Sequence, residues 1–157
     1  MIKAVIFDMD GLMFDTEQIN YRAFSEIVKE EGYEPTFEQF IAFLGLNAQS
    51  IQKLYRTYYG EDVDAQGLYK KVGQRSRKIA KEEGVPVKKG LRELLSVLKE
   101  KGIPCAVASG SDLDVIQAHL KQTGLTENFD QVVSSRGIKR GKPFPDIFLN
   151  ICEHFQI

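Results

Sequence analysis

Short apolar runs alternate with amphipathic stretches at the N-terminus and in the second half of the chain. Residues 2–7 form a nearly continuous apolar run, residues 103–108 a second, and residues 131–133 a weaker third. A run without polar alternation is typical of a parallel strand buried on both faces. Leucines at helical spacing precede the second run over residues 91–98, and another helical pattern follows it over residues 113–120. This order predicts an α/β fold with a Rossmann-like parallel sheet.

The stretch over residues 16–84 interrupts this alternation. Its apolar positions recur at helical spacing, and none of its runs has the pattern of a strand. We expect an all-helical insertion of about four helices, a cap, between the first strand and the rest of the sheet. The predicted domains are therefore an α/β core made of residues 1–15 and 85–157, and a helical cap of residues 16–84.

Composition narrows the classes of partner. The chain has 157 residues, of which 43% are hydrophobic, enough for a buried core. Its 21 basic and 22 acidic residues nearly cancel, which argues against nucleic acid as a partner. The apolar runs are too short to span a membrane, and the N-terminus does not resemble a signal peptide. Cys105 and Cys152 lie far apart in the sequence and lack a metal-binding spacing. We interpret them as unpaired cysteines in a reducing compartment, and we therefore expect a cytoplasmic location.

Two carboxylates follow the first predicted strand, in the sequence Asp8-Met9-Asp10-Gly11. Ligands of open parallel sheets bind beyond the carboxyl ends of the strands. Carboxylates there suit Mg²⁺, and one of them can attack phosphorus while the other handles a proton. Gly11 allows a sharp turn and a close approach to a ligand. The alternative is a polar turn in which these carboxylates only cap a loop.

Two further polar sites follow the other predicted strands. Ser109-Gly110-Ser111 lies between the second strand and a helix, where hydroxyl and N–H groups can hold an anion, or where a serine simply caps the helix. Lys142 precedes Pro143 after the third strand, and it is either a phosphate-binding cation or a solvated surface lysine. Together the three strand ends offer the nucleophile, metal ligands and cation that phosphoryl transfer needs.

The order of these motifs resembles the haloacid dehalogenase superfamily of phosphohydrolases. Within it, the chain resembles the branch that contains β-phosphoglucomutase and small phosphatases with a helical cap. The resemblance extends from Met1 to about Phe148 and is carried by four motifs: Asp8-Met9-Asp10-Gly11, Phe14-Asp15-Thr16-Glu17, Ala108-Ser109-Gly110 and Gly141-Lys142-Pro143-x-Pro145-Asp146.

The resemblance implies a mechanism and a site. Asp8 is the expected nucleophile, forming an aspartyl-phosphate, and its carboxylate binds Mg²⁺. Asp10 is the expected general acid and base, and its backbone carbonyl also binds the metal. The substrate is expected to be a small phosphorylated metabolite, with the cap as a lid. The residues expected to contact phosphate or substrate are Gly11, Glu17, Ser109, Gly110 and Lys142.

One departure from the family concerns the last core strands. The family carries an acidic motif after a fourth strand, which completes the Mg²⁺ site, and neither that motif nor the last strands are present in this sequence. We interpret the chain as part of a longer protein. The alternative is a short form that pairs its sheet edge with another copy, because an apolar edge strand promotes self-association.

A second departure concerns the cap. Mutases of this branch carry a histidine in the first cap helix and an arginine after the cap glycine, where this sequence has Asn20 and Ala48. This difference favours a phosphatase over a phosphosugar mutase, which remains an alternative. A further alternative is a catalytically impaired binding or oligomerising module, because the last acidic motif is missing. A dehalogenase is disfavoured, because its chemistry has no use for Asp10.

Overall fold

A computed structural model describes residues 2–157 as two compact units. The core unit comprises the residues up to Thr16 together with Gly84–Ile157. The helical unit is the intervening segment, Glu17–Glu83. The two units are described separately below.

The core unit is built on a parallel sheet of β1 (Val5–Phe7), β2 (Cys105–Ser109) and β3 (Gln131–Ser134), in the order β1-β2-β3. Val5 lies opposite Cys105, and Val107 lies opposite Val132. This parallel sheet confirms the predicted α/β class.

β2, and not β1, is the central strand of this sheet. All five residues of β2 are buried, whereas Val5 and Ile6 of β1 are only partly buried. Within the described residues β1 pairs with β2 alone, so one edge of β1 lacks a neighbouring strand. The first apolar run forms a parallel strand, as predicted, and its partial burial reflects its position at the edge of the sheet among the described residues.

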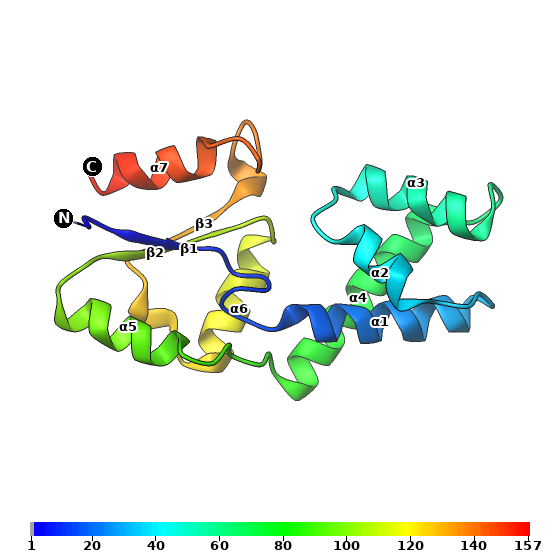
Figure 1. The fold of residues 1–157 in the computed structure, drawn as a ribbon, viewed down its shortest axis with the longest axis horizontal. Helices are drawn as coiled ribbons and strands as arrows, with labels where there is room; N and C mark the ends of the chain where they lie inside the picture. Colours follow the sequence, from blue (N-terminus) through cyan, green and yellow to red (C-terminus); the bar gives the residue numbers. More distant parts are fainter. Residues whose placement is uncertain (1) are drawn as a thin grey trace. The chain divides into compact units, whose positions relative to one another are not determined.

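Helices cover both faces of the sheet (Figure 1). α5 (Leu91–Glu100) and α6 (Leu113–Thr123) lie on one side, and α7 (Asp146–His154) lies on the other. Ala106 and Ala108 of β2 pack against Ile147 and Ile151 of α7, and all four are buried. Small residues on the strand let the helix approach closely, which fixes α7 over the sheet. Short 3₁₀ turns precede and follow β3, at Thr126–Asn128 and Ser135–Gly137.

The helical unit contains α2 (Phe37–Phe43), α3 (Ala48–Tyr59) and α4 (Ala65–Glu83), together with α1, which begins at the last residue of the core unit (Thr16–Glu30). Aromatic rings form much of its buried core: the Phe43 and Tyr55 centroids are 5.0 Å apart, and those of Phe24 and Phe43 are 5.4 Å apart. Edge-to-face packing of this kind stabilises a helix bundle beyond the area it buries.

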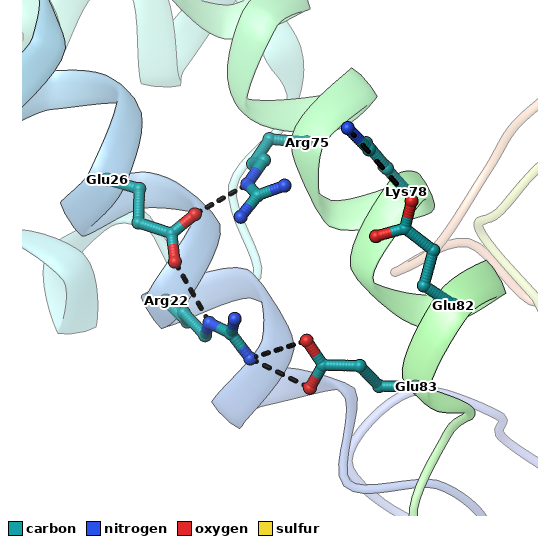
Figure 2. Close-up of polar contacts among 6 residues, drawn as sticks. All are labelled: Arg22, Glu26, Arg75, Lys78, Glu82 and Glu83. Atoms are coloured by element: carbon teal, nitrogen blue, oxygen red, sulfur yellow. Dashed lines mark hydrogen bonds and ion pairs between the residues drawn. The ribbon is translucent and has the colours of Figure 1, made fainter.

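Charged side chains join the first and last helices of the helical unit (Figure 2). Arg22 on α1 donates to Glu26 at 2.9 Å and to both carboxylate oxygens of Glu83 on α4. Glu26 also accepts from Arg75 on α4, and these two bonds lower the pKa of the Glu26 carboxyl. The network therefore ties the two helices through which the chain enters and leaves this unit.

None of the helices over residues 2–157 combines the length and the apolar character needed to cross a lipid bilayer.

Candidate active site

The loops after β1 and β3 bring two of the predicted residues into direct contact. The Lys142 Nζ lies 2.6 Å from Oδ1 of Asp8, although 134 positions separate the two in sequence. The same ammonium donates to the carbonyl of Ala108 at 2.9 Å and lies 5.6 Å from the ring centroid of Phe148 on α7. These contacts hold a cation beside a half-exposed carboxylate at the carboxyl end of the sheet.

Hydroxyl groups hold the second carboxylate, Asp10. Thr16 Oγ1 donates to Asp10 Oδ1 at 3.0 Å. Ser109 and Ser111 donate to Oδ2 at 3.3 and 3.0 Å. Thr16 and Ser109 are themselves buried, so these contacts fix the orientation of Asp10 and join the loops after β1 and β2.

Gly11 allows the tight loop that carries Asp10. Its φ of 75° lies in the left-handed region, where a Cβ is strained. The Gly11 N–H donates to the carbonyl of Phe14, and the N–H groups of Met13 and Phe14 donate to the carbonyl of Met9. The buried side chains of Met9, Met13 and Phe14 anchor the loop in the core unit. Gly11 is thus required by the conformation of the backbone.

Gly110 and Glu17 are the remaining residues that were predicted to contact phosphate or substrate. Gly110 lies between the two serines, and a Cβ there would approach Ser135 Oγ only to 3.9 Å, an ordinary contact. Glu17 is exposed in the first turn of α1 and belongs to the helical unit. A contact between Glu17 and substrate stays a prediction.

Several polar residues of the site did not stand out in the sequence. Ser134, the last residue of β3, donates through Oγ to the Ser111 carbonyl at 2.6 Å. Arg136, two residues later, forms an ion pair with Asp112 at 2.7 Å. Thr16 and Ser111 lie within motifs noted in the sequence, but neither was predicted as a site residue. Asp8 was selected by the strand-end rule, according to which ligands bind beyond the carboxyl ends of parallel strands. The same rule applies to Ser134, but only the side-chain geometry distinguishes these residues from ordinary loop residues.

The carboxylates offer oxygen ligands for a small cation. Within residues 2–157, no cluster of three or more His, Cys, Asp or Glu side chains could hold a metal ion. The hydrogen bonds from Met9 N–H and Lys142 to Asp8 both use Oδ1, which leaves Oδ2 for a metal. The loop's backbone hydrogen bonds use the carbonyls of Met9 and Phe14 and not that of Asp10. This donor set fits Mg²⁺, which keeps several waters and takes few protein carboxylates.

His119 on α6 packs beneath the loop of Asp10. Its ring is buried and meets Phe14 edge to face, with the centroids 5.8 Å apart. Burial lowers the pKa of this imidazole, and the nearby charge of Asp10 acts in the opposite direction. His119 is therefore a packing residue of the core unit.

Comparison with known proteins identifies the family. A sequence model described as "Haloacid dehalogenase-like hydrolase" matches residues 5–157. The chain belongs to this family. It is similar in structure to the haloacid dehalogenase-like protein ATU0790 of Agrobacterium tumefaciens, with a TM-score of 0.82 and 26% identity, covering 100% of this chain and 70% of that one.

Two curated relatives of this haloacid dehalogenase-like chain differ greatly in length. Fructose-1-phosphate phosphatase YqaB of Escherichia coli (strain K12) is 30% identical over 147 residues, which cover 92% of this chain and 76% of that enzyme. Protein SUPPRESSOR OF QUENCHING 1, chloroplastic, of Arabidopsis thaliana is 33% identical over 154 residues, which cover 94% of this chain. The matched region is only 14% of that plant protein, so the family likeness extends to one part of it.

Proposed function

We propose that this chain is a Mg²⁺-dependent phosphatase that acts on a small phosphorylated metabolite through an aspartyl-phosphate on Asp8. The observation that carries the proposal is the 2.6 Å contact between Asp8 and Lys142, with Asp10 bonded to Ser109 beside it. A nucleophilic carboxylate, a phosphate-binding cation and a second carboxylate are the groups that a phosphoryl transfer through the protein requires.

The proposed reaction has two steps. In the first, a carboxylate oxygen of Asp8 attacks the phosphorus atom, the ester P–O bond breaks, and the carboxyl of Asp10 gives its proton to the leaving oxygen. In the second, water attacks the phosphorus of the aspartyl-phosphate and Asp10 takes its proton. Inorganic phosphate leaves and the Asp8 carboxylate is restored. Lys142 and the Ser109 hydroxyl bind the phosphoryl oxygens throughout, which stabilises the charge of the transition state.

Asp8 Oδ2 and the backbone carbonyl of Asp10 would hold the Mg²⁺ ion. When bound, the ion supplies positive charge that offsets the repulsion between the Asp8 carboxylate and a phosphate dianion. With so few protein ligands among the described residues, we expect weak binding of Mg²⁺ in the absence of phosphate.

The substrate class follows from the relatives. One of them is named as a fructose-1-phosphate phosphatase, which makes a phosphorylated sugar or polyol the first candidate. We propose that the helical unit acts as a lid that excludes water and selects the leaving group. A cytoplasmic location remains part of the proposal.

A phosphosugar mutase is the second candidate of the same chemistry. At the position where the resembling mutases carry a histidine, Asn20 accepts a hydrogen bond from Ser76 through its side-chain oxygen. Asn20 thus has a partner inside the helical unit, and its amide is a poor proton donor or acceptor. This contact supports the phosphatase over the mutase.

The proposal predicts a specific difference between the two aspartates. Measure Mg²⁺-dependent hydrolysis of p-nitrophenyl phosphate and fructose 1-phosphate by the unaltered chain, Asp8→Asn and Asp10→Asn. Asp8→Asn should abolish hydrolysis and weaken Mg²⁺ binding, because an amide neither attacks phosphorus nor binds the metal as a carboxylate does. Asp10→Asn should keep Mg²⁺ binding but lose roughly 10²–10⁴-fold in rate. An active Asp8→Asn variant would exclude the covalent mechanism.

A further inference from the structure

Arg136 is an exposed cation on the loop that follows β3. Its side chain is 63% exposed, and its Nε lies 2.7 Å from Oδ1 of Asp112 on the loop after β2. An ion pair at the surface contributes little to stability. Its importance here is its position, because it holds a guanidinium beside Asp112 at the same end of the sheet as Asp8 and Asp10.

A continuous series of contacts links Arg136 to the proposed acid and base. Ser111 donates to Asp10 at 3.0 Å, and the carbonyl of Ser111 accepts from Ser134 at 2.6 Å. The Ser134 hydroxyl also accepts the N–H of Arg136 at 3.2 Å. The backbone of Arg136 is therefore tied to the residue that directly precedes Asp112 and contacts Asp10.

Asp112 forms an ion pair with the guanidinium and does not cap the helix. Asp112 occupies the N-cap position of α6, yet its side chain makes no capping hydrogen bond. Its carboxylate contacts Arg136 instead, through Nε. Among residues 2–157, the guanidinium of Arg136 has no ion pair with any residue besides Asp112, and it donates no hydrogen bond. Its two terminal nitrogens form a planar donor pair that matches the oxygens of a carboxylate or a phosphate.

Two other cations of this loop, Arg140 and Lys142, are already engaged. Arg140 contacts Asp146 at 3.0 Å through both Nε and a terminal nitrogen, and it lies 4.8 Å from the ring centroid of Phe144. Lys142 contacts Asp8. Arg140 is thus a matched control: an exposed arginine on the same loop with the same charge but a different environment.

We infer that Arg136 forms a second anion subsite of the proposed active site, adjoining Ser111. Among the phosphorylated sugars and polyols of the proposed function, the subsite selects esters that carry a second anionic group, such as the carboxylate of a sugar acid, over esters of similar size that lack one. Asp112 and Ser134 are its positioning residues. The inference rests on the proposed function, because the phosphoryl group itself must bind at Lys142 and Ser109.

Calorimetric titration of the whole chain, with Mg²⁺ present, tests this subsite without requiring turnover. The ligands are inorganic phosphate and two pairs in which a carboxylate replaces a hydroxymethyl group: 2-phosphoglycolate with 2-hydroxyethyl phosphate, and 3-phosphoglycerate with glycerol 3-phosphate. In at least one pair, the carboxylate should bind about tenfold more tightly, the size of one charge-assisted hydrogen-bonded pair. Arg136→Gln should remove this preference and change the affinity for inorganic phosphate by less than about twofold, and Arg140→Gln should retain the preference.

Two results would overturn the subsite alone: a preference for the carboxylate that survives in Arg136→Gln, or no preference in either pair while inorganic phosphate binds. Arg136→Gln removes an exposed side chain, and an unchanged melting temperature would verify that the variant is folded. If the unaltered chain fails to bind inorganic phosphate, the proposed function fails, and the subsite fails with it.

Discussion

Lys142 is the residue on which phosphate binding depends most directly. Its ammonium bonds to Asp8 and to the Ala108 carbonyl, so its position is set before any ligand arrives. Lys142→Gln should lower the affinity for inorganic phosphate by roughly 10–100-fold, since it removes a charge-assisted hydrogen bond. Lys139→Gln, the same change on the same loop at an exposed residue, should lower it by less than about twofold. Equal losses in both variants would mean that the loop attracts phosphate only through its overall charge.

The two glycines of the site make opposite predictions for stability. Gly11 has a φ of 75°, so Gly11→Ala should destabilise the chain by about 1–2 kcal/mol. Gly110 has no positive φ and has room for a Cβ, so Gly110→Ala should change stability by less than about 0.5 kcal/mol. Urea denaturation of both variants measures the difference. A Gly110→Ala variant as unstable as Gly11→Ala would contradict the loop geometry described above.

At the scale of single elements, α6 carries a titrating group beneath the active-site loop. Burial holds the pKa of His119 below the value of about 6.5 of an exposed histidine. Between that lowered pKa and about 6.5 the unfolded chain binds more protons than the folded one, so stability falls as the pH is lowered through this window. Below the lowered pKa the full penalty is present.

The effect of His119 can be isolated by substitution. Measure the free energy of unfolding at about pH 7.5 and about pH 5.5, on either side of the unperturbed histidine pKa. His119→Leu should lose less stability between the two values than the unaltered chain, because the buried titrating group is gone. His154→Leu, which changes the exposed second histidine, should behave like the unaltered chain. The same pH dependence in all three chains would exclude a contribution from His119.

The strand-end rule explains how much of the site could be predicted from sequence. Asp8 and Lys142 meet because each follows a strand of one parallel sheet, and apolar runs reveal those strands. The contacts of Ser134 and Arg136 could not be predicted, because they depend on side-chain rotamers in two loops. Hydropathy likewise did not show that β1 is an edge strand, since the pairing of strands decides which one is central.

At the scale of the whole molecule, we expect copies of the chain to associate through the edge of β1, which pairs with β2 alone among the described residues. Its register pairs it with β2 on one side, and Ile2, just before the strand, is 65% exposed. Ile2→Lys should reduce self-association measured by light scattering, because a lysine at a sheet edge discourages strand pairing. Leu94→Lys, at a 46% exposed apolar position on α5, is the control and should leave association unchanged. An equal reduction in both variants would point to a general effect of surface hydrophobicity.

The central claim is that Asp8 accepts a phosphoryl group. The most direct measurement mixes the chain with Mg²⁺ and acetyl phosphate, stops the reaction with acid, and determines the intact mass. We predict that the chain gains the mass of one phosphoryl group, that peptide mapping places it on Asp8, and that Asp8→Asn gains none. Phosphorylation of Asp8→Asn to the same extent, or hydrolysis of the donor by the unaltered chain through a route that does not require Asp8, would contradict the proposed mechanism.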